Sequence, residues 1–233
     1  MSDPSSVDHL PELMAILAHD MRNPLSALLT NIHFVQSVAK GSQLDVDEAL
    51  SDSVLSCMIL GQVIGNLEVL GRAFGGARLA PTLVSTREAA GHAVARAAPQ
   101  AVIAGIDLRV AAGDETTVFV DPVFFGRAID NVVANALQYS PAKGKIALEL
   151  IAKDGRGGVA VLDGGPVVPP EFREAVLTQS GQAEAKKRYE ARYGRGLGLF
   201  CAAQAARISG GELTITESNG RFCAEIWGPL SKA

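Results

Sequence analysis

The sequence predicts an α+β protein in which a long helical hairpin precedes an α/β sandwich. Apolar residues recur at helical spacing from about Leu10 to Phe74, and beyond Pro81 helical and strand-like stretches are interleaved. Helices mixed with antiparallel strands in this way are typical of a sheet with helices on one face. Because 48% of the 233 residues are hydrophobic, the chain can form a core, and disorder is excluded for most of its length.

The first segment is predicted to form two helices joined by the turn-forming stretch Lys40–Gln43. Its apolar residues follow one another at intervals of three, four or seven: Leu10, Met14, Leu17, Met21, Leu28, Ile32 and Val35, then Leu50, Val54, Cys57, Gly61, Ile64 and Leu67. One such hairpin cannot cover its own apolar faces, whereas two can do so as a four-helix bundle. We therefore expect a homodimer. Packing of the hairpin onto the rest of its own chain is the alternative.

A glycine-rich stretch, Gly71–Gly76, predicts a hinge between a domain of residues 7–76 and a domain of residues 82–230. The second domain contains predicted helices at Arg87–Ala98, Val123–Leu137 and Leu197–Ile208, and predicted strands at Ile106–Val110, Thr116–Val120, Ile146–Ile151, Val159–Leu162, Leu213–Thr216 and Phe222–Trp227. The glycines of Gly155–Gly158 predict the turn between the two central strands.

Composition excludes several classes of function. A net charge of −4 is unsuited to duplex nucleic acid, which needs a basic surface. Cys57, Cys201 and Cys223 share no CxxC spacing, which excludes a disulfide framework and a structural zinc site. The amino terminus is unlike a signal peptide, and no apolar run approaches the roughly 20 residues that span a bilayer. We therefore expect a cytoplasmic protein without a membrane span.

His19 is the first residue with potential chemistry. On a helix it would lie about 160° from Leu17 and from Met21, and therefore toward solvent. An exposed imidazole is partly neutral at pH 7 and can act as a nucleophile, and the adjacent Asp20 could fix its tautomer. Pro24 is expected to disturb the helix after it. An exposed histidine without a function is the alternative.

Two further motifs have the chemistry of a nucleotide site. Asn131 and Asn135 share one face of an otherwise apolar helix, where a hydrated Mg²⁺ and phosphate oxygens would satisfy their carboxamides. Asp163 ends a predicted strand and is followed by glycines, so its carboxylate could accept a hydrogen bond from the amine of adenine. The alternatives are hydrogen-bonding asparagines and an ordinary Asp-Gly turn.

The glycines of Gly194–Leu199 open a predicted helix, where backbone N–H groups can bind phosphate. Basic residues outnumber acidic ones in the preceding stretch, Glu184–Arg195, although the protein is acidic. A mobile lid over a triphosphate would have this charge, and so would a solvated helix face.

The order of these motifs resembles the catalytic core of sensor histidine kinases over nearly the whole chain, from about Leu10 to Pro229. The matching boxes are the phosphoacceptor box at His19–Leu25, the N box at Asn131–Pro141, and the two glycine boxes at Asp163–Pro166 and Gly194–Leu199. Asp121 stands where the family has an aspartate at a strand end. The resemblance implies a dimerisation and histidine phosphotransfer hairpin, followed by an ATP-binding sandwich of the histidine kinase type.

The resemblance also implies roles for individual residues. His19 would take the γ-phosphoryl group of ATP and pass it to an aspartate of a response-regulator receiver domain, with Asp20 as base or tautomer anchor. Asn23 would orient a water that removes phosphate from that partner. ATP and Mg²⁺ would be bound by the remaining residues: Asn131 and Asn135 for Mg²⁺ and phosphates, Tyr139 near the base, Asp163 for the adenine amine, and Gly165, Gly194, Arg195, Gly196, Leu197 and Gly198 around the nucleotide and the lid end. The stimulus would come from a separate sensor protein, or the chain is the core of a larger protein.

Three positions depart from the family's pattern. Val167 replaces the second glycine of the first glycine box, Gln138 replaces a frequent lysine before the N-box tyrosine, and Phe172 is the only aromatic residue left in the following box. A β-branched valine is unfavourable at a positive φ. The alternative function is therefore a phosphotransfer adaptor or pseudokinase that relays phosphate through His19. A serine kinase of the anti-sigma type would leave the His19 hairpin unexplained.

Overall fold

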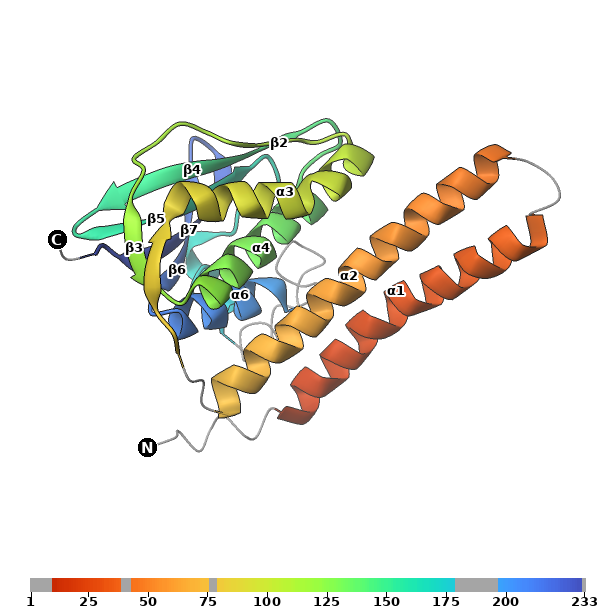
Figure 1. Cartoon of the computed structure of the whole chain (residues 1–233), viewed down its shortest axis with the longest axis horizontal. Helices are drawn as coiled ribbons and strands as arrows, with labels where there is room; N and C mark the ends of the chain where they lie inside the picture. Colours follow the sequence, from red (N-terminus) through yellow and green to blue (C-terminus); the bar gives the residue numbers. More distant parts are fainter. Residues whose placement is uncertain (1–9, 39–42, 76–78, 179–196, 232–233) are drawn as a thin grey trace. The chain divides into compact units, whose positions relative to one another are not determined.

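The computed structural model describes residues 10–38, 43–75, 79–178 and 197–231, with residues 10–20, 36–38, 43–45, 47, 48, 51, 74 and 75 described as backbone only. The chain divides into two compact units, Met1–Glu68 and Val69–Ala233, and each is described by itself. The predicted fold class, a helical hairpin followed by an α/β sandwich, is confirmed (Figure 1).

Two long helices, α1 (Leu10–Val38) and α2 (Gln43–Gly75), form the hairpin. α2 continues through Gly71–Gly75, where the sequence predicts a hinge. A glycine inside a helix costs about 1 kcal/mol relative to alanine. Val69 and Leu70, which are buried in the preceding turn, supply packing that offsets this cost.

One segment of α2, Asp52–Ala73, is long and apolar enough to cross a membrane by length and composition alone, and 33% of its most apolar window is buried. The expectation of a chain without a membrane span is therefore not confirmed. That expectation rested on uninterrupted apolar runs, whereas this segment intersperses polar residues among apolar ones. The same composition suits a helix in the core of a bundle.

The sandwich is built on a five-stranded sheet with the strand order β2-β4-β5-β7-β6. The strands are β2 (Asp107–Val110), β4 (Lys145–Lys153), β5 (Arg156–Asp163), β6 (Glu212–Ser218) and β7 (Arg221–Pro229). β2 runs parallel to β4, and the other pairs are antiparallel. A separate antiparallel pair consists of β3 (Thr117–Val120) and β1 (Thr82–Ser85), a strand that the sequence analysis does not predict.

Three helices, α3 (Thr86–Ala104), α4 (Pro122–Tyr139) and α6 (Gly198–Ile208), cover one face of the sheet (Figure 1). Their apolar sides meet the central strands in one core, which includes Phe125, Ile129, Ile146, Leu148, Val159, Val161, Ala202 and Ala205. Because the core takes up the apolar side of α4, the polar residues of this helix lie at the margin of the core.

Asp121 fixes the start of α4. Its Oδ1 accepts hydrogen bonds from the N–H groups of Val123 and Phe124, at 3.0 and 3.4 Å, and so caps the helix. Its Oδ2 accepts from the N–H of Ala80 at 3.0 Å. The aspartate at the end of β3 therefore joins the beginning of α4 to the segment that precedes β1.

The other face of the sheet has a polar covering around the only tryptophan of the chain. Trp227 of β7 donates a hydrogen bond from Nε1 to Glu225 at 3.2 Å. Arg156 of β5 lies 5.1 Å from the centre of the Trp227 ring and donates to Glu212 at 2.9 Å. Since Trp227 is almost fully enclosed, its fluorescence reports whether the sandwich is folded.

Candidate functional site

The two asparagines of α4 are buried at the edge of the helix layer. Asn131 is 3% exposed and Asn135 is 7% exposed. Residues four apart share a helix face, so the two carboxamides point to the same side. The Nδ2 of Asn131 donates to the backbone oxygen of Arg127 at 3.0 Å. This bond orients the carboxamide and makes its oxygen the atom suited to bind a cation.

Asp163 ends β5 and is completely buried. Its Oδ1 accepts a hydrogen bond from the N–H of Gly165 at 2.7 Å, which closes a tight turn. A Cβ added to Gly164 would lie 3.6 Å from Cδ of Pro141, just beyond the end of α4. The turn after β5 therefore lies against the carboxyl end of α4.

The start of α6 lies beside Asn131. Leu197 is buried, and a Cβ added to Gly198 would lie 4.0 Å from the backbone oxygen of Asn131. The first N–H groups of a helix have no partner within it, and this end is positively polarised. An anion placed near Asn131 would therefore meet the favourable end of α6.

These contacts fix the order in which the polar groups follow one another along α4, and this series is called the polar row. Asp163 lies at the carboxyl end, and Asn135, Asn131 and the start of α6 follow toward the amino end. The structure thus brings together Asn131, Asn135, Asp163, Gly165, Leu197 and Gly198. Gly194, Arg195 and Gly196 lie outside the described residues, and so do the side chains of His19 and Asp20.

One polar atom at this site was not anticipated from the sequence. The Oγ of Ser140 is buried and has no hydrogen-bond partner among the residues that the structure describes. Ser140 follows the half-buried Tyr139 and precedes Pro141. It therefore lies at the carboxyl end of α4, near the turn that begins at Asp163. A buried hydroxyl without a partner is costly, and a nucleotide base or its water would satisfy it. This end of the site therefore fits a polar ligand such as a nucleotide base.

The site also fits Mg²⁺ held together with phosphate. Mg²⁺ prefers oxygen ligands and retains several waters, and it is commonly bound by few protein groups together with substrate phosphates. Asn131 and Asn135 offer two such oxygens. Within the described ranges no cluster of three or more His, Cys, Asp or Glu side chains could hold a metal ion without the phosphates.

The departures from the family's pattern do not distort the backbone. Outside glycine, the described residues with positive φ are Lys143, Asp154 and Asn219, so Val167 is unstrained. In the segment that follows, Phe172 packs against the sandwich core, and Val176 is buried within it. Aliphatic packing thus occupies the place of the missing aromatic residues.

The phosphoacceptor box lies within α1. His19 is in this helix, which continues through the buried Pro24, so the proline does not end it. Asn23 is exposed. Because Asn23 follows His19 by four residues, the two share one face of α1.

Comparison with known proteins agrees with this geometry. Residues 120–232 match the family of histidine kinase-, DNA gyrase B- and HSP90-like ATPases. The signal transduction histidine-protein kinase/phosphatase MprB of Mycolicibacterium smegmatis is 28% identical over 212 residues, which are 88% of this chain and 42% of that protein. The chain spans about half the length of the curated relatives it matches.

Solved structures show the same fold. Histidine kinase AdeS of Acinetobacter baumannii has a TM-score of 0.61 at 16% identity, over 92% of this chain and 98% of that chain. Full-length ShkA in complex with AMPPNP has a TM-score of 0.58 at 23% identity, over 96% of this chain and 47% of that chain.

Residues 120–232 therefore resemble the histidine kinase-, DNA gyrase B- and HSP90-like ATPases. Together with the hairpin, this match and the histidine kinase relatives support a resemblance of the chain to a sensor histidine kinase catalytic core. The resemblance inferred from the order of the sequence motifs is confirmed.

Proposed function

We propose that the protein is an ATP-dependent histidine kinase, which phosphorylates itself on His19 and passes the phosphoryl group to an aspartate of a response-regulator receiver domain. The main support is the polar row along α4, where Asp163, Asn135, Asn131 and the start of α6 follow one another in the order that ATP requires. The test is transfer of label from γ-labelled ATP to the chain, with calorimetry of Mg·ATP to distinguish a kinase from an adaptor that binds no nucleotide.

In this mechanism the residues of the sandwich bind and orient the nucleotide. Asp163 accepts a hydrogen bond from the adenine amine, and the N–H groups that begin α6 donate to phosphate oxygens. Asn131 and Asn135 would hold Mg²⁺, which would supply charge neutralisation. Catalysis of phosphoryl transfer consists mostly of such positioning and electrostatic stabilisation.

The hairpin supplies the nucleophile. A neutral ring nitrogen of His19 attacks the γ-phosphorus, the bond from that phosphorus to the bridging oxygen breaks, and ADP leaves. Asp20 holds the other ring nitrogen as its N–H tautomer. In the second step the carboxylate of the receiver aspartate attacks the same phosphorus, and the imidazole leaves.

The exposed apolar stripes of the hairpin support a homodimer. Leu25, Leu29 and Ile32 of α1, and Leu50, Val54 and Ile64 of α2, are between 41% and 54% exposed. On α2 these residues continue the repeat of three and four to which Cys57 belongs. A second hairpin would cover both stripes. In a bundle with two-fold symmetry, the same residue of each hairpin lies at the same height along the bundle axis.

We therefore expect a short bismaleimide to cross-link the wild-type chain into a covalent dimer through Cys57. Cys57 is exposed, whereas Cys201 and Cys223 are buried, and burial raises the pKa of the Cys223 thiol to about 11. Because the thiolate is the reactive form, Cys223 is inert at pH 7. Denaturing electrophoresis measures the dimer, and Cys57→Ser is the control. If dilution reduced the cross-linked fraction in proportion to the protein concentration, the cross-links would come from random collisions between chains. This result would contradict the dimer.

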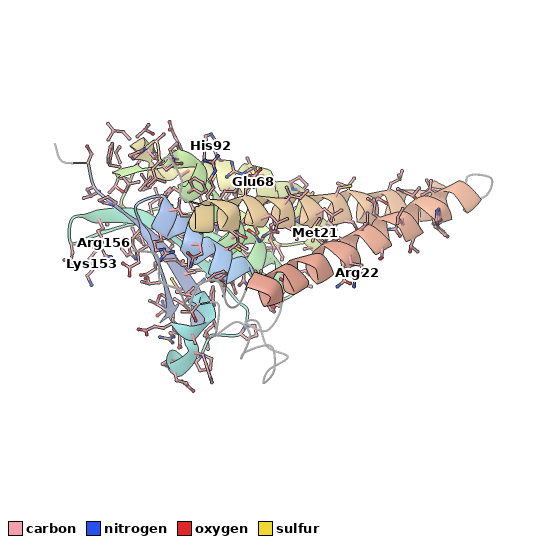
Figure 2. All side chains as sticks on the ribbon, turned by 90° about the horizontal axis from the view of Figure 1, so that it is seen from below. Met21, Arg22, Glu68, His92, Lys153 and Arg156 are labelled. Carbon is pink, nitrogen blue, oxygen red and sulfur yellow. The ribbon has the colours of Figure 1, made fainter. Side chains whose placement is uncertain are left out.

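Asn23 is proposed to position the water that removes phosphate from the receiver. Replacing it by alanine should leave labelling of His19 within a few-fold of wild type and slow dephosphorylation of the receiver about 10²-fold, as is typical of a lost positioning group. The adjacent Arg22 is exposed and points away from α2 (Figure 2), so Arg22→Ala is the matched control.

Both rates are measured with the same receiver preparation, once with ATP and once with phosphorylated receiver alone. Loss of His19 labelling in Asn23→Ala as complete as in a variant without the histidine would mean that Asn23 maintains the helix before Pro24. The phosphatase role would then be abandoned.

A further inference from the structure

An uncharged apolar surface lies where β1, β3 and the start of α4 meet. Leu83 of β1 and Phe119 of β3 are register partners in the two-stranded sheet, and they are 62% and 48% exposed. Register partners in an antiparallel pair share one face of the sheet. Leu79, just before β1, is 46% exposed, and Val123, in the first turn of α4, is 63% exposed. We call these four residues the β1–β3 surface.

Asp121 holds the parts of this surface together. Its two carboxylate oxygens accept hydrogen bonds from the N–H groups of Ala80 and Val123, both at 3.0 Å. Pro81 and Pro122, which adjoin these two residues in the chain, are exposed and uncharged as well. A single exposed apolar side chain needs no explanation, whereas a contiguous apolar patch is typical of an interaction site.

The size of the surface decides which kind of partner can use it. Each of the four side chains is about half exposed and offers on the order of 100 Å², so the surface amounts to roughly 400 Å². A stable complex between two free proteins buries about 800 Å² on each partner. The β1–β3 surface is therefore too small to hold a separate protein by itself. It suits a partner that another interface already keeps nearby.

A second copy of the chain is such a partner. In the proposed homodimer the hairpins hold two sandwiches in one particle, and a tether of this kind gives an effective concentration of about a millimolar. A surface without charged residues needs no complementary charge, so it can pack against itself across a two-fold axis. Leu83 and Phe119 of each copy would then be shielded from water, which is favourable for apolar side chains.

We propose that the β1–β3 surface packs against the same surface of a second copy, so that the two sandwiches of the homodimer associate. This inference rests on the proposed homodimer, because the hairpin interface keeps the two copies together. It does not require ATP, and it assigns a partner to an apolar surface that the nucleotide site does not use.

A single accessible cysteine tests the pairing in the full chain. Cys201 and Cys223 are buried, so in Cys57→Ser/Leu83→Cys a short bismaleimide reacts at position 83. It should join chains into covalent dimers in a fraction that does not change on dilution, because the partner is tethered. The matched control is Cys57→Ser/Val102→Cys. Val102, near the end of α3, is 79% exposed, and cross-linking there should be about fivefold lower or less, since no paired surface holds it beside its equivalent.

A charge placed in the surface tests whether apolar packing causes the pairing. Phe119→Lys, added to the chain with the cysteine at position 83, brings two like charges together and should lower cross-linking to the level of the Val102 control. Val123→Lys should do the same, and it decides the matter if the first variant does not fold. Trp227 fluorescence verifies folding of each variant.

Four results would overturn the proposal. They are equal cross-linking at positions 83 and 102, cross-linking at position 83 that falls in proportion to protein concentration, and cross-linking that survives both lysine substitutions. The fourth is protection of position 83 from a monofunctional maleimide without cross-linking, which would mean that another part of the same chain covers the surface.

Cys57 of the wild-type chain tests the homodimer separately. If Cys57 cross-links and position 83 does not, only the proposed pairing of sandwiches fails. If neither cross-links, the pairing and the homodimer both fail. Cross-linking at position 83 alone, with the expected effect of the lysine variants, would support the paired surfaces and reject the dimer through the hairpin.

Discussion

Replacing His19 by glutamine should abolish labelling of the chain by γ-labelled ATP, with a loss of about 10³-fold or more. Glutamine is similar in length and polarity but has no nucleophilic nitrogen, and removal of a nucleophile costs at least this much in enzymes that act through one. Nucleotide affinity should stay within twofold of wild type, because Asn131 and Asp163, the proposed nucleotide contacts, are unchanged. The measurement is incorporation of label after electrophoresis, with calorimetry alongside.

Two controls sharpen this experiment. His33 is exposed on the same helix as His19, so His33→Gln removes an equivalent side chain without touching the phosphoacceptor box. A phosphoramidate is labile in acid and stable in alkali, so the label on the wild type should disappear after acid treatment. Equal labelling of wild type and His19→Gln would remove His19 from the mechanism.

The fold was largely predictable because its local periodicities agree with its tertiary packing. The pattern of Val123–Leu137 predicts α4, and its apolar side forms much of the core. β1 was missed because it has four residues, and only Val84 among them packs against the core. Contacts between distant segments also could not be read from the sequence. Gly157, predicted as part of a turn, lies inside β5, where an added Cβ would clash with the side chain of Thr116.

The site was predictable in its residue types but not in its assembly. A helical face can be computed from sequence spacing, so Asn131 and Asn135 were found together. Contact between Gly164 and Pro141, or between Gly198 and Asn131, depends on how β5 and α6 pack against α4. The buried hydroxyl of Ser140 has no signature in sequence.

Replacing Asp163 by asparagine should reduce ATP affinity about 10²-fold, which corresponds to about 2.7 kcal/mol. The side chain is completely buried, and its Oδ1 accepts from the N–H of Gly165 at 2.7 Å. Asparagine has the same shape and can retain this bond, so the turn should persist. Its N–H₂ group would then face the amine of adenine, donor against donor, and a hydrogen bond to a charged acceptor, with a typical net contribution of about 1.5–3 kcal/mol, would be lost.

The choice of base gives this prediction a readout that general damage would not produce. A carboxylate accepts from the adenine amine and repels the carbonyl oxygen that guanine has in its place, so the wild type should prefer ATP to GTP. Asp163→Asn should reduce or reverse this preference, because its amide can donate to that carbonyl. Asp154→Asn, in the turn before β5, is the matched control; asparagine tolerates the positive φ of this position, and the preference for ATP should be unchanged. An Asp163→Asn variant that weakens ATP and GTP by the same factor would show that Asp163 supports the turn instead of recognising the base.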